Sequence, residues 1–378
     1  MDDNLIKKII TFKSGKFVFS RKYAANKLEN KFTRSSLLYD FVGDLPVLPD
    51  MAAQINEEII RRSIFGTAAL EGNPLTEEKV ERILSEPQGV MKPQLAEKEI
   101  RNLKTAYDRV AGLPQSGSPL LIDEGLIKNL HALITADLEY ENNFPGAYRN
   151  HTVKVGDAEH GGVYTPPNCL DDIRNLMQEY VAWINSEALV AQNPIIRASL
   201  AHYHFELIHP FGDANGRTGR IIEAAMLHAG GVKYVPRMLS NFYYRNKDDY
   251  FRSFSASLAD RENDLTPFLD FTCQGHLDSL QEIKSRILFL IRRNALRDYF
   301  HYLRKERKIG RRQCDLVNLL LDYMKPVTLE ILFTASPFDI LYRGVSERTA
   351  RRDLQDLSSR ELLLRKDGKY ELNLRALD

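Results

Sequence analysis

One run of twelve residues carries side chains that suit nucleotide chemistry. The run is His209-Pro210-Phe211-Gly212-Asp213-Ala214-Asn215-Gly216-Arg217-Thr218-Gly219-Arg220. His209 can accept a proton near neutral pH, and Asp213 offers the hard carboxylate oxygen that Mg²⁺ prefers beside phosphate oxygens. Arg217 and Arg220 lie three positions apart, so two guanidinium groups on one helical face can hold successive phosphates. The run predicts a site for nucleotide phosphates and Mg²⁺ with a histidine general base.

Two helical patterns, at 194–208 and 217–229, flank this run. The start of the second helix would present unpaired backbone N–H groups and a partial positive charge, which suit a phosphate. Gly212, Gly216 and Gly219 allow the backbone to approach closely. The alternative is an ordinary loop with a hydrogen-bonded histidine and surface arginines. A Walker A loop is excluded because the sequence has no Gly-x4-Gly-Lys-Ser/Thr run.

The run resembles the signature of the Fic family, His-Pro-Phe-x-Asp/Glu-Gly-Asn-Gly-Arg-x-x-Arg. It departs only at Ala214, where the family usually has glycine; a positive φ there would cost alanine ~1 kcal/mol. The resemblance continues upstream through Ala201-His202 and 205–208, and covers roughly residues 55–275. It implies transfer of AMP from ATP to a Tyr, Ser or Thr hydroxyl of a target protein or of the protein itself.

The resemblance also implies a role for each residue of the motif. His209 would deprotonate the target hydroxyl, Asp213 would hold Mg²⁺, and Arg220 would hold the γ-phosphate. Tyr250 and Phe251 would pack on adenine, although aromatic residues at helical spacing are more often core. The residues expected to contact ATP are Gly212, Asp213, Ala214, Asn215, Gly216, Arg217, Arg220, Asn246, Tyr250 and Phe251.

A second motif lies upstream, in Thr67-Ala68-Ala69-Leu70-Glu71-Gly72. It resembles the inhibitory motif Ser/Thr-x-x-x-Glu-Gly/Asn that precedes the catalytic motif in one class of Fic proteins. Thr67, Glu71 and Gly72 are its specified residues. A glutamate at a helix end could pair with Arg220 and take the place of the γ-phosphate. The resemblance also allows this glutamate to assist the removal of AMP, and a simple helix stop remains the alternative.

A β-hairpin is predicted at 153–164, around the pair Gly161-Gly162. It resembles the flap of Fic proteins, which would add an extended segment of the target protein as a further strand. Backbone pairing of this kind fixes the register of the target segment but selects little among its side chains. A hairpin with a purely structural role remains the alternative.

The composition predicts a cytoplasmic protein without a membrane partner. The 378 residues include 52 Lys and Arg and 51 Asp and Glu, so no overall charge favours nucleic acid or anionic membranes. The three cysteines, at 169, 273 and 314, lack the spacing of a zinc site or a disulfide framework. The N-terminal 20 residues lack the apolar run of a signal peptide, and no segment approaches the ~20 apolar residues of a membrane span.

The predicted fold is mainly α: a Fic-type helical bundle with a β-hairpin flap and a small C-terminal winged-helix domain. Helices are expected near 51–70, 75–84, 94–110, 123–136, 170–185, 194–208, 217–229, 314–324 and 346–359. Four regions follow in order. They are an N-terminal helical region with the inhibitory helix (1–115), a Fic catalytic core (116–280), a basic linker helix (281–312) and a winged helix-turn-helix (313–378).

The C-terminal region has an order of elements typical of DNA-binding modules, helix, helix and hairpin. Ser346 is a candidate N-cap for an arginine-containing helix, and basic residues at 365–369 would lie on the wing. Acidic residues dilute this charge, and winged helices also contact proteins. Three functions therefore stay open. They are an adenylyltransferase restrained by Glu71, a DNA-binding regulator whose Fic core senses nucleotides, and a Fic enzyme that removes AMP or transfers another phosphate-linked group. A homodimer is a further expectation.

Overall fold

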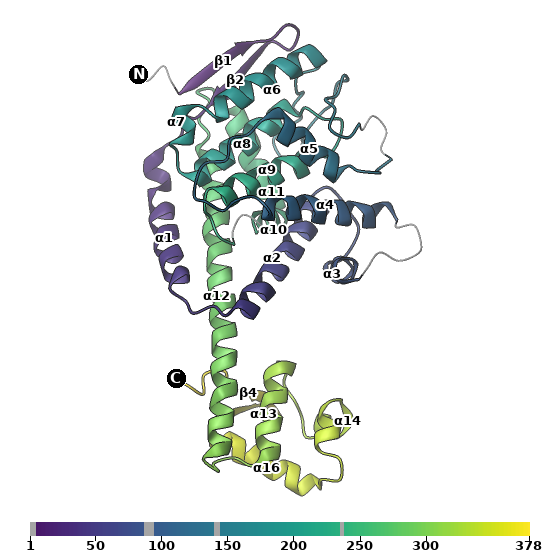
Figure 1. Ribbon diagram of the computed structural model, residues 1–378, viewed down its shortest axis with the longest axis vertical. Coiled ribbons are helices and arrows are strands. Elements are labelled where there is room, and N and C mark those ends of the chain that lie inside the picture. Colours follow the sequence, from purple (N-terminus) through teal and green to yellow (C-terminus); the bar gives the residue numbers. More distant parts are fainter. Residues whose placement is uncertain (1–4, 87–93, 140–143, 235–237) are drawn as a thin grey trace. The chain divides into compact units, whose positions relative to one another are not determined.

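The computed structural model describes residues 5–86, 94–139, 144–234 and 238–378, and Figure 1 shows it as a mainly helical protein. The chain divides into two compact units. The first comprises 1–45 and 52–284, and the second comprises 46–51 and 285–378. The prediction of a mainly α fold is confirmed.

The first unit contains a two-stranded sheet and most of the helices. Its centre is the pair α8 and α9, which pack against each other, with α4 and α5 packed on α9 and α6 packed on α8 (Figure 1). The elements are β1 (Ile6–Ile10), β2 (Lys16–Ser20), α1 (Ala25–Gly43), α2 (Pro49–Leu70), α3 (Glu77–Ser85), α4 (Leu95–Ala111), α5 (Glu124–Ile134), α6 (Leu170–Ile184), α7 (Glu187–Val190), α8 (Pro194–Ile208), α9 (Asn215–Ala229), α10 (Leu239–Arg245), α11 (Lys247–Ala259) and the start of α12 (Thr266–Lys305).

Helices α8 and α9 are buried along nearly their whole length. Pro194 at the first turn and the Asn193 side chain, which accepts a hydrogen bond from the Ile195 N–H, start α8. Helix α8 ends at His209, which has left-handed backbone angles (φ 50°). Because both helices are surrounded by protein, the six-residue connection between them is held from both sides.

The hairpin β1–β2 and helix α1 were not predicted. The strands are antiparallel with Ile6 opposite Ser20. Each strand has five residues, which is too short for an alternating pattern to be recognised in the sequence. Phe19 is buried and lies 5.2 Å from the ring of Trp183 in α6. His204 of α8 bonds to the backbone of Ser20, and burial lowers the pKa of this histidine to about 4. The hairpin therefore covers the outer side of α6 and α8.

Asp172, in the first turn of α6, holds the tip of this hairpin. Its buried carboxylate accepts hydrogen bonds from the backbone N–H groups of Phe12, Lys13 and Ser14 and from the Ser14 hydroxyl. Burial by itself would raise the pKa of Asp172, but these hydrogen bonds lower it well below its usual range. The charged form is thus the one that the folded protein stabilises.

Asp172→Asn is expected to lower the free energy of unfolding by roughly 2–3 kcal/mol at pH 7, because several bonds to a charged acceptor are weakened. The folded-state pKa is depressed, so this contribution is present above the unfolded pKa of ~3.9 and is lost as the pH falls through the folded value. Urea unfolding followed by the single tryptophan, Trp183, would measure it. Asp171→Asn, on the neighbouring exposed position, is the control; an equal loss in both variants would contradict the assignment.

The second unit is a small helical module with a C-terminal hairpin. It contains the end of α12, α13 (Arg311–Tyr323), α14 (Ile331–Thr334), α15 (Phe338–Leu341), α16 (Glu347–Ser359), β3 (Leu363–Lys366) and β4 (Lys369–Leu372). Strands β3 and β4 are antiparallel with Leu363 opposite Leu372. The unit has its own core, in which Phe300, Leu320, Phe338 and Leu357 are fully buried. A basic helix was expected at 281–312; α12 instead begins at Thr266 and ends at Lys305.

Among the described residues, no helix has both the length and the apolar character needed to cross a membrane.

Candidate functional site

His209 lies at the C-cap of α8, where the chain turns toward α9. Its side chain is 19% exposed, and its Nδ1 atom lies 3.5 Å from the Oε2 atom of Glu206, one helical turn earlier. Neither Nδ1 of His209 nor Oε1 of Glu206 has a hydrogen-bond partner. A carboxylate on the Nδ1 side orients an imidazole so that Nε2 is left for other contacts. The Glu206 carboxylate lies on the Nδ1 side of the His209 ring, so Nε2 is the nitrogen left for other contacts.

The loop after His209 is held by Asn215 at the start of α9 and by two neighbours, Arg149 and His131. Asn215 accepts a hydrogen bond from the Phe211 N–H and donates one to the Phe211 carbonyl, both at 2.9 Å. Arg149 donates to the His209 carbonyl at 2.7 Å. The ring of His131 stacks on Phe211 at 3.7 Å, and the loop is thereby fixed before any ligand binds.

His131 is neutral in this structure. Its Nδ1 accepts from the Gly146 N–H at 2.9 Å, so its Nε2 carries the proton and donates to the Asp213 carbonyl at 3.1 Å. Burial lowers the pKa of His131 to about 4, which keeps this tautomer at neutral pH.

Ala214, the departure from the family signature, has φ 59° and is 2% exposed. The position thus requires the left-handed backbone that glycine adopts freely and alanine adopts at a cost of ~1 kcal/mol. The loop keeps this conformation, because the Ala214 carbonyl accepts from both the N–H and the hydroxyl of Thr218.

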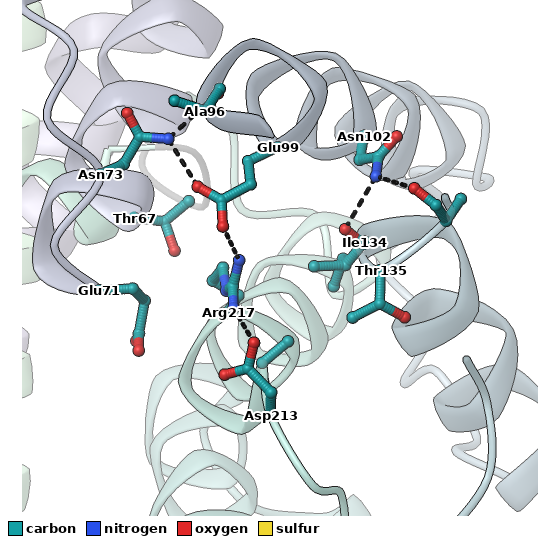
Figure 2. A network of polar contacts seen from close by, with 12 residues as sticks. Thr67, Glu71, Asn73, Ala96, Glu99, Asn102, Ile134, Thr135, Asp213 and Arg217 are labelled. Atoms are coloured by element: carbon teal, nitrogen blue, oxygen red, sulfur yellow. Dashed lines mark hydrogen bonds and ion pairs between the residues drawn. The ribbon is translucent and has the colours of Figure 1, made fainter. Parts of the chain in front are cut away.

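The two arginines of the motif, both buried, are each paired with a carboxylate from the N-terminal part of the chain. Nη2 of Arg220 donates to Glu71 at 2.6 Å, and Nη1 of Arg217 donates to Glu99 at 3.0 Å. Arg217 also bonds to Asp213 at 2.9 Å through Nη2. Figure 2 shows Glu71, Glu99 and Asp213 around the start of α9.

Glu71 follows the last residue of α2 and is aimed by a glycine turn. Gly72 has φ +86°, which reverses the chain and leaves the Glu71 carboxylate against α9. A Cβ atom at Gly216 would overlap that carboxylate, so a larger residue there would displace the Glu71 side chain. Burial would raise the pKa of Glu71, but the charges of Arg220 and Arg217 lower it below its ordinary value. Thr67, buried in α2, accepts from the Arg220 Nε at 2.8 Å.

The three residues predicted near adenine lie in different surroundings. Tyr250 is 4% exposed, stacks on Tyr243 at 5.0 Å and bonds through its hydroxyl to His202 at 3.1 Å. The Asn246 side chain donates to the Phe242 carbonyl. Only Phe251 lines a hollow of about 230 Å³. That hollow is bordered by Val155, Gly156, His160, Gly161, Gly162, Val163, Tyr164, Phe251, Phe254, Ser255, Leu258 and Ala259.

The segment predicted as a flap forms a narrow turn rather than two full strands. Val155 and Tyr164 make an isolated antiparallel bridge, with backbone hydrogen bonds of 2.9 and 2.8 Å. His160 links the turn to α11 through Asp157 and Asp248. Val163 is exposed, so the outer edge of this turn faces solvent.

Among the described residues, no three His, Cys, Asp or Glu side chains are grouped as a metal cage. Mg²⁺ needs no such cage, since one or two carboxylates together with substrate phosphates hold it. Asp213, with a side chain 38% exposed at the start of α9, fits that requirement.

Sequence reasoning missed Glu99, Glu206, Arg149 and His131 as parts of the site. Only Glu206 had a local signal, because it precedes His209 by three residues and lies on the same helical face. Glu99 lies 118 residues from Arg217 in the chain, and no spacing rule connects them.

Comparison with known proteins finds a family match in the part of the chain that contains His209, Arg217 and Arg220. The model of the Fic/DOC family matches residues 121–227. Two curated relatives are protein adenylyltransferases Fic, from Drosophila ananassae (29% identical over 219 residues, 57% of this chain and 40% of the relative) and from Culex quinquefasciatus (24% over 244 residues, 64% and 45%). The chain thus spans less than half the length of the curated relatives it matches.

Two solved structures share the fold. The crystal structure of a Fic family protein from Desulfovibrio desulfuricans G20 has a TM-score of 0.57 at 21% identity, and the match covers 92% of this chain and 95% of that one. Fic-1 (residues 134–508) from C. elegans has a TM-score of 0.52 at 20% identity, with 68% and 72% covered.

Proposed function

Because residues 121–227 form a Fic/DOC family domain, we propose that this protein transfers AMP from ATP to a side-chain hydroxyl of a target protein or of itself. The observation that carries the proposal is the position of His209 at the end of α8, with Glu206 on its Nδ1 side and the start of α9 six residues ahead. A base and a phosphate cradle on two packed helices form one site.

In this reaction His209 accepts the proton of the target hydroxyl as that oxygen attacks the α-phosphorus of ATP. The bond between the α-phosphorus and the bridging oxygen breaks, and pyrophosphate leaves. Backbone N–H groups at the start of α9, together with Arg217 and Arg220, stabilise the charge that grows on the phosphates. Glu206 keeps the imidazole in the orientation that accepts the proton.

Asp213 would hold Mg²⁺ against the phosphates, and the ion would supply charge neutralisation there. The Asp213 carboxylate bonds to Arg217 through Oδ2. If Asp213 bound the ion in place of Arg217, the Nη2 group of Arg217 would become available to a phosphate.

Phe251, rather than Tyr250, is the aromatic residue that we assign to adenine. Its ring borders the hollow between the 153–164 turn and α11, while the ring and hydroxyl of Tyr250 are engaged within the protein. The exposed edge of the same turn would accept an extended segment of the target by strand pairing. Both assignments place the target hydroxyl and the nucleotide beside the same turn.

Glu71 would keep the enzyme at rest. It occupies Arg220, the residue assigned to the γ-phosphate, at 2.6 Å. ATP would then bind without the contact that aligns its α-phosphate for attack. This arrangement corresponds to the inhibitory motif recognised at Thr67, Glu71 and Gly72.

The proposal is tested by incubating the full chain with ATP labelled at the α-phosphate, Mg²⁺ and a proteome extract. Label bound to protein is expected with Glu71→Gly and not with His209→Ala. If Glu71→Gly transfers no label to any protein, the proposed function is wrong.

The second unit favours an additional role as a winged-helix module that binds DNA. In α16 the buried residues Ala350, Leu354 and Leu357 face the core, while Arg348 and Arg352, one turn apart, are exposed. Ser346 caps the helix by accepting from the Thr349 N–H. Exposed basic residues also follow at Arg365, Lys366 and Lys369 in the β3–β4 hairpin. A helix and a hairpin with basic surfaces suit contact with phosphates.

Duplex DNA is expected to bind this protein with an affinity that falls steeply with salt, and Arg352→Ala is expected to weaken it several-fold because a phosphate contact is lost. Gel shifts at several salt concentrations would measure both effects. Arg261→Ala, an exposed arginine of the first unit, is the matched control. Absence of binding at low salt would remove DNA as a partner.

A further inference from the structure

A second carboxylate contacts the phosphate-binding arginines. Glu99 of α4 accepts from Nη1 of Arg217 at 3.0 Å, as Glu71 accepts from Nη2 of Arg220 at 2.6 Å. Glu71 lies in the turn after α2 and Glu99 lies in α4, and each contacts one arginine of the motif. Figure 2 shows the row formed by Asn73, Glu99, Arg217 and Asp213.

Helix α4 holds Glu99 in a fixed position. Ile100 and Leu103 of α4 are fully buried, and α4 packs on both α5 and α9. Asn102 adds two bonds to carbonyls at the end of α5, at 3.2 and 2.7 Å. The side chain of Glu99 is 13% exposed and that of Arg217 is 4% exposed, so solvent screens this pair only weakly.

Asn73 connects Glu99 to the end of the inhibitory helix. It lies two residues after Glu71 and donates to Oε2 of Glu99 at 2.6 Å, while Oε1 of Glu99 accepts from Arg217. The same amide group donates to the Ala96 carbonyl at 3.1 Å, and Oδ1 of Asn73 accepts from the Leu75 N–H at 3.1 Å. The turn after α2 therefore aims both carboxylates, Glu71 directly and Glu99 through Asn73.

We propose that Glu99 is a second brake, which opposes nucleotide binding by occupying Arg217 and by placing a negative charge beside the phosphates. The proposal rests on the proposed function, since it takes Arg217 to be a phosphate ligand. The two glutamates would oppose the binding of different phosphate groups. Glu71 competes for Arg220 and hence for the γ-phosphate, whereas Glu99 acts on Arg217 and opposes any nucleotide with a phosphate at that arginine.

Glu99→Gln keeps the shape of the side chain and an oxygen that accepts from Arg217, but removes the negative charge. Removal of this charge weakens the hold on Arg217 and the repulsion of phosphate, so the variant is expected to bind nucleotide roughly tenfold more tightly, which corresponds to about 1.4 kcal/mol. Calorimetric titration with ATP and with ADP, each with Mg²⁺, would measure this in proteins that also carry His209→Ala, which prevents turnover. Glu99→Gln should tighten the binding of both nucleotides, while Glu71→Gly should tighten ATP more than ADP.

Two variants sharpen the test. Glu99→Asp keeps the charge but withdraws it from Arg217 by one methylene, so its affinity should lie between those of Glu99 and Glu99→Gln. Glu97→Gln makes the same charge change on α4 at a position that points away from Glu99 on the helix, and its affinity should equal that of the parent. Thermal melting of each protein identifies a variant that fails to fold, and Glu99→Asp then carries the test.

The outcomes separate the two proposals. If neither the parent nor any variant binds ATP or ADP, the proposed nucleotide site is wrong. If ATP binds and Glu71→Gly tightens it, but Glu99→Gln leaves the affinity unchanged or weakens it, Glu99 is not a brake and the proposed function stands. An equal gain from Glu97→Gln would assign the effect to overall charge and would likewise overturn the role of Glu99.

Discussion

His209→Ala is expected to lower the rate of AMP transfer by a factor of about 10²–10⁴, the usual contribution of a positioned general base. The reason lies in the geometry at the end of α8, where Glu206 lies 3.5 Å from Nδ1 of His209. Alanine removes the imidazole that would accept the proton of the target hydroxyl. The measurement is the initial rate of label transfer in the Glu71→Gly background, where the rate of the parent is highest.

The binding of ATP serves as the control for this variant. His209 is 19% exposed and its Nδ1 atom has no hydrogen-bond partner among the described residues, so the phosphate site should survive the substitution and ATP affinity should change little. Loss of binding together with loss of transfer would mean that His209 supports the fold of the loop. Unchanged transfer would favour a nucleotide sensor in place of a catalyst.

Glu71→Gly is expected to raise label transfer by roughly one to two orders of magnitude. The substitution removes a charged hydrogen bond to a fully enclosed arginine, an interaction of roughly 1.5–3 kcal/mol, and so frees Arg220 for the γ-phosphate. The change is compatible with the backbone, because Glu71 lies in the turn after α2 and not within the helix. Initial rates of self-labelling and of labelling in extract, at equal protein concentration, would measure the effect.

Glu86→Gly is the matched control, since Glu86 is an exposed glutamate directly after the end of α3. It should leave the rate unchanged. A Glu71→Gly protein that labels no faster than the parent would contradict the brake. A prelabelled target protein could instead lose its label faster with the parent than with Glu71→Gly. That result would favour the removal of AMP as the chemistry that Glu71 assists.

The glutamates of the site show how far local reasoning reaches. The sequence alone predicts the role of Glu71, because its motif has a fixed internal spacing and ends on a glycine that permits the turn. Glu99 has no such spacing: it lies in an ordinary amphipathic helix, and 51 acidic residues could in principle meet Arg217. Only the packing of α4 on α9 selects it.

The aromatic pair Tyr250 and Phe251 makes the same point. Adjacent residues on a helix point about 100° apart, so the two rings meet different surroundings. The sequence of α11 does not say which ring lies inside the protein. Tyr250 contacts His202 and Tyr243 and therefore lies inside the protein. Phe251 instead borders the hollow.

The sequence by itself determined the helical class and predicted the site at 209–220, because these residues lie within twelve positions and the helices on either side fix their spacing. At Ala214 the sequence left a positive φ only as a condition, and the structure has φ 59° there. Tertiary structure alone decided what those residues meet: Glu206 beside the base, Glu71 and Glu99 on the two arginines, and Asn73 between the carboxylates. The physical reason is that helical spacing is a local property of the backbone, whereas an ion pair across more than a hundred residues depends on how separate helices pack.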